Sequence, residues 1–263
     1  MAKIELHPDY EQRRRIMELV MAAGKILLEN GAEVFRVEQT MTIMARSFHL
    51  REFNVYVLTN GIFASAGTAE ISEVRNVPTR TTHLGRVDAV NTLSRRIAAG
   101  ELSLDEAEQC LADILQMPGI TARSQVLASG LGSACFAILF GGTLVDFAVA
   151  FAAGALLGWF MLGCSQRHIS AMLQRMMGSA LISAVCVAFS AVLPGAAHSY
   201  SIIGTLMVLT PGVAFTMGIR DFVKGDYLSG TIRMMDALLV AACIACGVGL
   251  TMALIGWMGG VPV

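Results

Sequence analysis

Long apolar runs separated by short polar connections fill the second half of the chain, whereas the first half mixes polar and apolar residues. A helix needs about 20 mostly apolar residues to cross a bilayer. Five runs approach this length, and each predicts a membrane span: 125–143, 147–164, 176–194, 200–219 and 237–258. A large soluble helical bundle is the alternative, and five nearly charge-free runs argue against it.

The pattern before residue 122 predicts a compact α+β domain. Apolar residues recur with helical periodicity in two segments near the start and in two near the end of this region, and alternating residues lie between them. The predicted elements are helices 11–29, 33–48, 88–99 and 103–116, a β-hairpin over 53–67 and a further strand around 73–78. The expected fold class is therefore an α-helical polytopic membrane protein with a cytoplasmic α+β domain at 1–121 and a membrane domain at 122–263.

Local signals mark three points in the first domain. Asn30-Gly31 is typical of a helix that ends with a left-handed residue. Asn60-Gly61 between alternating residues predicts a β-hairpin turn. Ser103, followed three residues later by Glu106, predicts a capping box at the start of a helix.

Composition supports the division into two domains. Only 15% of the residues are charged, against roughly 25% in soluble domains, and most of the charge lies before Ser124. The net charge of −1 gives no sign of nucleic-acid binding.

The distribution of basic residues predicts the orientation in the membrane. Two connections between spans contain basic residues, and the other two contain none; the basic residues are Arg167, Arg175, Arg220, Lys224 and Arg233. Because basic loops stay in the cytoplasm, we expect a cytoplasmic N-terminus and a C-terminus on the outer side of the membrane.

The fourth predicted span contains Pro211-Gly212. Proline removes a backbone donor and clashes with the preceding turn, so the pair predicts a break in the helix. Broken spans form midplane sites in secondary transporters, but a proline kink without a ligand role explains the residues equally well.

Charged residues around these spans are candidates for a substrate path or gate: Arg220, Asp221, Asp226, Arg233 and Asp146. We expect Arg220 to attract a substrate carboxylate, and Asp221 or Asp226 to orient Arg220 or accept a proton. Asp146 stands near the outer end of the second span. It either serves a proton or substrate within the membrane or caps the helix.

Motifs for catalysis or cofactor binding are absent from the sequence. It contains no GxxxxGK[ST], HExxH or GxSxG pattern. Cys243 and Cys246 form a CxxC without further ligands nearby, whereas zinc takes about four. Glu33 and Arg36 share a predicted helix face, where an exposed ion pair is the simplest interpretation. We therefore expect no metal, no cofactor and no enzymatic activity.

Three segments together resemble the threonine/serine exporter family: AAGKILLENGAEVFRVEQTM, VNTLSRRIAAGELSLDEA and TPGVAFTMGIRDFVKGDYLSGTIRMMDALL. The resemblance covers nearly the whole chain. Within the family, this chain resembles the split form, the YjjP type. It implies a second small membrane subunit of the YjjB type and export of succinate, with threonine or serine as the next candidates. It also implies a bacterial inner membrane, in which the outer-side C-terminus would be periplasmic. The motif positions that it implies are Gly31, Glu33, Arg36, Glu38, Pro211, Gly212, Arg220, Asp221, Gly225, Asp226, Gly230 and Arg233.

Two other functions stay open. The chain could be a sensing or assembly subunit of a transporter whose path lies in the partner. It could instead be a membrane-tethered enzyme with a catalytic N-terminal domain, although no nucleophile with a neighbouring base is evident.

Overall fold

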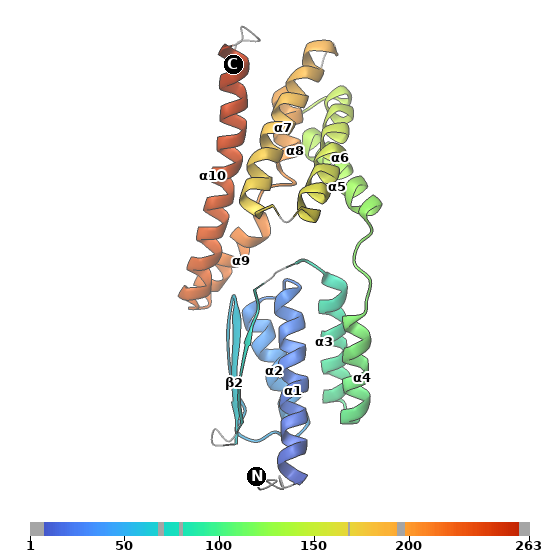
Figure 1. The fold of residues 1–263 in the computed structure, drawn as a ribbon, viewed down its shortest axis with the longest axis vertical. Helices are drawn as coiled ribbons and strands as arrows, with labels where there is room; N and C mark the ends of the chain where they lie inside the picture. Colours follow the sequence, from blue (N-terminus) through green and yellow to red (C-terminus); the bar gives the residue numbers. More distant parts are fainter. Residues whose placement is uncertain (1–7, 68–70, 79–80, 168, 194–197, 258–263) are drawn as a thin grey trace. The chain divides into compact units, whose positions relative to one another are not determined.

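The computed structural model describes residues 8–67, 71–78, 81–167, 169–193 and 198–257. The chain divides into two compact units, Met1–Gly119 and Ile120–Val263 (Figure 1). Each unit is described by itself below.

The first unit contains helices and a small antiparallel sheet of strand order β1-β2-β3. Its elements are α1 (Pro8–Glu29), α2 (Val34–Ser47), β1 (Asn54–Leu58), β2 (Gly61–Ala66), β3 (Ile71–Asn76), α3 (Leu84–Ala98) and α4 (Leu104–Leu115). Apolar side chains of α1 and α2, including Met17, Val20 and Met41, are fully buried in its core. Each helix predicted here from periodicity is present, with bounds that differ by a few residues.

The β1–β2 turn lies one residue earlier than predicted. Leu58 pairs with Gly61, so the two connecting residues are Thr59 and Asn60, and the prediction of a turn at Asn60-Gly61 was wrong by one position. The physical reason is the environment of this connection: Thr59 is buried, and the Asn60 carbonyl accepts a hydrogen bond from Val77 N–H at 2.8 Å. These contacts fix the turn before the glycine.

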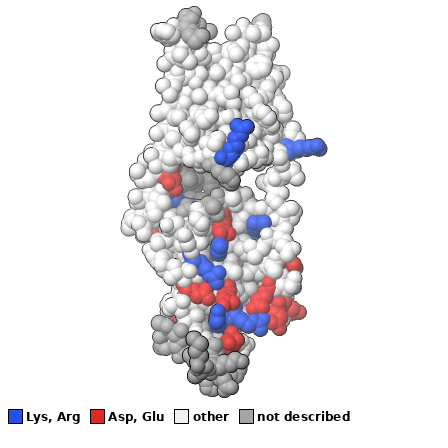
Figure 2. Space-filling view, in the orientation of Figure 1, with Lys and Arg blue, Asp and Glu red and all other residues white. Residues whose placement is uncertain are grey.

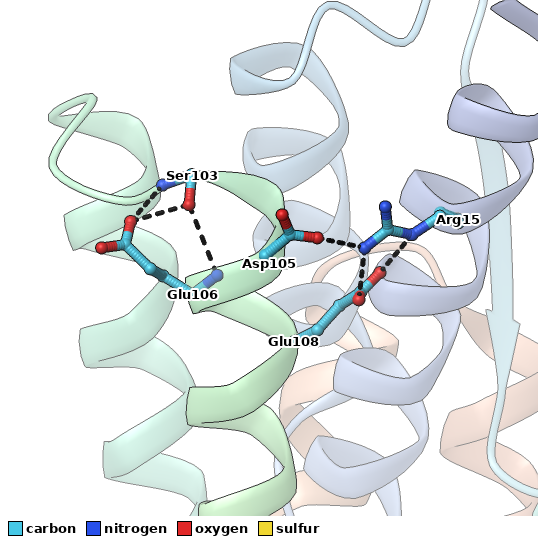
Figure 3. Close-up of polar contacts among 5 residues, drawn as sticks. All are labelled: Arg15, Ser103, Asp105, Glu106 and Glu108. Carbon is cyan, nitrogen blue, oxygen red and sulfur yellow. Dashed lines mark hydrogen bonds and ion pairs between the residues drawn. The ribbon is translucent and has the colours of Figure 1, made fainter. Parts of the chain in front are cut away.

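The two helix-end signals are confirmed. Gly31 has φ +93°, and Ala32 N–H donates to the Leu27 carbonyl at 2.9 Å, which closes α1 at a left-handed glycine. Ser103 N–H and the Ser103 hydroxyl each donate to Glu106 at 2.8 Å, and the structure contains the predicted capping box at the start of α4 (Figure 3). Hydrogen bonds from the Ser103 backbone and then its side chain lower the pKa of Glu106.

An ion-pair cluster beside this cap joins α1 to α4. Arg15 of α1 contacts Asp105 and, at 2.7 Å, Glu108, as Figure 3 shows. Hydrogen bonding to Glu108 and then to Asp105 raises the pKa of Arg15. Because all three side chains are substantially exposed, we expect the cluster to contribute little to stability.

The second unit is entirely helical in its described residues: α5 (Ala122–Leu139), α6 (Leu144–Gln166), α7 (Ala171–Val192), α8 (His198–Leu206), α9 (Gly212–Val223) and α10 (Tyr227–Trp257). Three of these helices, α6, α7 and α10, are long and apolar enough to cross a membrane. Figure 2 shows few charged side chains over the upper part of this unit.

The predicted count of five spans is not confirmed. The first predicted span, 125–143, corresponds to α5, whose first turn contains Arg123 and Gln125, and these polar residues lower its hydropathy. The fourth, 200–219, is divided between α8 and α9, and each is too short to cross a bilayer alone. Residues 194–197 and 258–263, which include much of the predicted outer connection and the predicted periplasmic C-terminus, lie outside the described residues.

Small residues bring the helices of this unit close together. A Cβ at Gly154 of α6 would lie 2.7 Å from the Ser129 carbonyl of α5, and the Ser129 hydroxyl donates to the Gly154 carbonyl at 2.7 Å. A Cβ at Gly204 of α8 would lie 2.6 Å from Ala137 N of α5. Such approaches are typical of helix packing in membranes, where small residues replace hydrophobic burial as the source of tight contact.

Candidate functional site

The candidate site begins where α8 ends. Hydrogen bonds from Leu209 N–H and Thr210 N–H to the Leu206 carbonyl, at 2.9 and 3.0 Å, close a turn that directly follows α8. The chain then passes through Pro211, and α9 starts at Gly212. The break predicted from Pro211-Gly212 is therefore present. Its assignment to a substrate path stays a prediction.

Short polar and small side chains hold α8 inside the unit. Ser201 and Thr205 are completely buried, and Thr205 satisfies its hydroxyl by donating to the Ser201 carbonyl at 2.8 Å. Helix α8 packs against α5, α6 and α7, whereas α9 packs mainly against α10. The break thus separates a half-helix enclosed by three others from a half-helix with one main neighbour.

A pocket of about 360 Å³ lies beside the break. Residues from the broken segment line it together with residues of α5 and α6: Gln125, Ala128, Ser129, Leu157, Gly158, Met161, Val208 and Leu209. Its lining is mostly apolar with a few polar groups, which is the usual chemistry of a small-ligand site. Freed backbone groups of a broken membrane helix need protein, water or ligand as partners, and this pocket gives a ligand access to Val208 and Leu209.

Asp146 caps α6. Its Oδ2 accepts hydrogen bonds from Thr143 N–H at 2.7 Å and from the Thr143 hydroxyl at 2.8 Å, and Thr143 and Asp146 form a reciprocal capping box. Asp146 is fully buried, and the Ser201 hydroxyl lies 3.5 Å from its Oδ1. The geometry of Asp146 is therefore that of a helix cap, the second of the two alternatives. Its contact with Ser201 also connects α6 to α8.

Asp221 and Arg233 form a buried ion pair between α9 and α10. Arg233 Nε lies 3.0 Å from Asp221 Oδ2, and the two side chains are 10% and 8% exposed. The two atoms are not aligned as a hydrogen bond, so the contact is best described as a charge pair. Sequence reasoning singled out both residues but did not pair them.

The other charged candidates lie around the α9–α10 turn. Gly225 has φ +84° and makes the turn possible. Asp226 directly precedes α10, and its Oδ1 accepts a hydrogen bond from Ser229 N–H at 3.1 Å. Arg220 is exposed. The structure therefore places Asp221 against Arg233 and gives Asp226 the role of a helix cap; a role for either in orienting Arg220 stays a prediction.

The motif of the first unit lies around the α1–α2 connection. Gly31 ends α1, and Glu33 is the extended N-cap residue of α2 rather than a helical residue, so it does not share a helix face with Arg36 as predicted. Arg36 donates to Gln39 at 3.4 Å. Glu38 accepts a hydrogen bond from Val57 N–H at 2.9 Å, which attaches α2 to β1.

Two buried hydroxyl residues at the site were missed by sequence reasoning, Ser201 and Ser229. Both are fully buried. Serine is common in loops and helices alike, so only the tertiary contacts distinguish these two from other serines.

Comparison with known proteins places this architecture in a family. The family model described as "Putative threonine/serine exporter" matches residues 18–255. A Mycobacterium tuberculosis protein named "Probable threonine/serine exporter" is 26% identical over 89% of this chain and 45% of its own length. Proteins named "Pheromone-regulated membrane protein 10" from Pichia sorbitophila and Zygosaccharomyces rouxii are 24% and 27% identical over 97% and 98% of this chain, and over 26% and 27% of their own lengths.

The chain spans less than half the length of these relatives. No solved structure matches it. The family match covers both units and includes the broken helix and the Asp221–Arg233 pair. On this evidence the chain belongs to the threonine/serine exporter family of membrane proteins.

Proposed function

We propose that this chain is a subunit of a secondary exporter for small carboxylates or amino acids in a bacterial inner membrane. Succinate is the first candidate substrate, and threonine or serine the next. The N-terminal unit would lie in the cytoplasm and the C-terminus in the periplasm. The observation that supports the proposal best is the break between α8 and α9 beside the 360 Å³ pocket, because such breaks form binding sites in secondary transporters.

The proposed path passes the break and continues along α9 to its charged end. The pocket beside Val208 and Leu209 lies at the start of α9, and the Asp221–Arg233 pair lies near its end. Arg220, exposed at the same end, would attract the anionic substrate from the cytoplasm. Since α9 packs mainly against α10, it can move with fewer broken contacts than α8, which suits a gate.

A second small membrane subunit of the YjjB type would complete the transporter. Support for this part comes from the resemblance to the split form and from transporters that place their substrate site between two structural repeats. In an assembly of this kind, the exposed apolar side chains of the second unit would contact lipid on one side and the partner on another.

Efflux from loaded cells tests the proposal. Cells that lack related exporters would express this chain with or without the partner, and release of labelled succinate and labelled threonine would be followed. We expect release of at least one substrate only when both chains are present. Absence of release, with both proteins detected in the membrane, would contradict the export function.

A double variant tests whether this chain lines the path. Pro211→Ala with Gly212→Ala restores helix-forming residues at the break, and we expect it to reduce efflux by at least tenfold while the two chains still copurify. Gly163→Ala is the matched control, because a Cβ there would contact nothing. Normal efflux by the double variant would favour an assembly or sensing role.

A further inference from the structure

Three buried polar side chains lie at the charged end of α9 and on the first turns of α10. Ser229 is completely buried, and Asp221 and Arg233 are 6% and 8% exposed. Ser229 and Arg233 are four residues apart, so they lie on the same face of α10. The hairpin therefore encloses a hydroxyl, a guanidinium and a carboxylate in a unit that is otherwise mostly apolar.

The guanidinium of Arg233 has unused hydrogen-bonding capacity. An arginine side chain carries five N–H donors in a planar fork. Nε faces Asp221 Oδ2 at 3.0 Å, and Nη1 lies 3.8 Å from the thioether sulfur of Met217, which is a weak acceptor. Nε is buried without a hydrogen-bond partner, and the Met217 sulfur is the one hydrogen-bonding contact found for the Nη atoms among the described residues.

Ser229 likewise has a hydrogen-bond donor without an acceptor. Its hydroxyl is buried and has no hydrogen-bond partner among the described residues. Buried polar groups are nearly always hydrogen-bonded, and one that is not needs an explanation. Two neighbouring groups with unmet donors, one of them cationic, indicate a ligand that brings anionic oxygen.

Close helix packing holds this cluster in place. A Cβ at Gly230 would lie 2.8 Å from the Phe222 ring and 3.1 Å from the Gly218 carbonyl, so α9 and α10 cross with almost no space between their backbones. A Cβ at Gly218 would in turn touch the Cβ of Arg233 at 3.4 Å. The base of the Arg233 side chain is thereby held between two closely packed helices.

We propose that the Nη edge of Arg233 and the hydroxyl of Ser229 bind a carboxylate of the transported substrate, and that Asp221 positions the guanidinium. The proposal rests on the exporter function and assigns its substrate site. The arginine guanidinium binds carboxylates through two parallel hydrogen bonds. Because Asp221 contacts Nε, the two Nη atoms can still donate such a pair. The substrate class recognised is a small carboxylate, free to enter when α9 moves from α10.

At this site Asp221 favours threonine over succinate, which reverses the order in which the resemblance places the two candidate substrates. Its carboxylate attracts the ammonium group of a zwitterion such as threonine and repels the second carboxylate of succinate. Asp221→Asn removes this negative charge, so we expect it to raise efflux of succinate relative to efflux of threonine.

Ser229→Ala is the most informative variant. Removing a buried hydroxyl without a partner leaves no group unsatisfied, so thermal stability should stay the same or rise. The proposal predicts a roughly tenfold rise in the KM for efflux, the loss expected for a hydrogen bond to a charged group. Arg233→Lys keeps the charge but loses the fork, and it should raise KM by at least as much.

The assay is efflux from cells or proteoliposomes containing the complete transporter, measured over a range of internal labelled threonine or succinate. Lys224→Gln, at the exposed end of α9, is the charge-loss control and should keep the wild-type KM. Wild-type KM values in both Ser229→Ala and Arg233→Lys would overturn the site and leave a structural ion pair. Absence of efflux by the wild-type transporter would instead contradict the exporter function, so the two failures are distinguishable.

Discussion

Two glycines of α10, two positions apart, allow a direct test of the packing in the membrane unit. A Cβ at Gly247 would collide with the Met176 carbonyl and the Ser179 hydroxyl of α7, and would lie 3.1 Å from Ala180 N. A Cβ at Gly249 would contact nothing. Alanine at Gly247 therefore forces α10 away from α7, whereas alanine at Gly249 does not.

The cost follows from the nature of the atoms contacted. The Met176 carbonyl belongs to a helix backbone and cannot rotate away, and the Ser179 hydroxyl already donates to that carbonyl at 2.9 Å. A withdrawal of about 1 Å forfeits up to half of the dispersion energy of each lost contact, and overpacking of this kind costs about 1–3 kcal/mol. The gain in helix propensity from glycine to alanine is common to both variants, so it cancels in their comparison.

The assay is equilibrium unfolding of the full chain in mixed detergent micelles, followed by tryptophan fluorescence. We expect Gly247→Ala to lower the folded-to-unfolded ratio by roughly 5- to 150-fold relative to Gly249→Ala. Loss of the Thr251 hydroxyl contact to the Ala180 carbonyl, now at 3.3 Å, should accompany the shift. Equal unfolding curves for the two variants would refute the reasoning.

Two further predictions concern the first unit. Because hydrogen bonds from Ser103 lower the pKa of Glu106 from its ordinary value of 4.5, the charged carboxylate stabilises the start of α4 above that value, and this contribution disappears as the pH falls through the lowered pKa. Glu106→Gln should therefore make amide exchange at the start of α4 less dependent on pH between neutral and acidic conditions; an unchanged dependence would contradict the assignment. Gly31→Ala introduces a side chain at φ +93° and should cost about 1–2 kcal/mol, measured as faster amide exchange at the end of α1; wild-type exchange would show that the backbone can avoid this conformation.

Local signals in the first unit predicted much of its structure. The α1 end at Gly31 and the capping box at Ser103 depend on residues within a few positions of one another, so the sequence contains all the needed information. The hairpin turn lies one residue earlier than predicted because the N–H of Val77, which directly follows β3, donates a hydrogen bond to the Asn60 carbonyl. That contact is not local, and dipeptide preference does not include it.

In the membrane unit, the sequence predicted the helix break but did not predict that Asp221 pairs with Arg233. Pro211-Gly212 interrupts a helix through its own chemistry, so the break could be read directly. The pairing of Asp221 with Arg233 depends on how tightly Gly218 and Gly230 let α9 approach α10. The hydropathy pattern contains five apolar runs, but hydropathy alone does not indicate that the fourth run, 200–219, folds as two half-helices.

Substrate protection of the broken segment tests the central claim most directly. Val208 lines the pocket and is 40% exposed, so a single cysteine placed there in a chain without its native cysteines should react with a small water-soluble thiol reagent. The account predicts that the transported carboxylate slows labelling of Val208→Cys at least severalfold and leaves labelling of Arg51→Cys, on an exposed loop of the first unit, unchanged. Equal labelling of Val208→Cys with and without substrate, in a complex that exports normally, would contradict a path at the break.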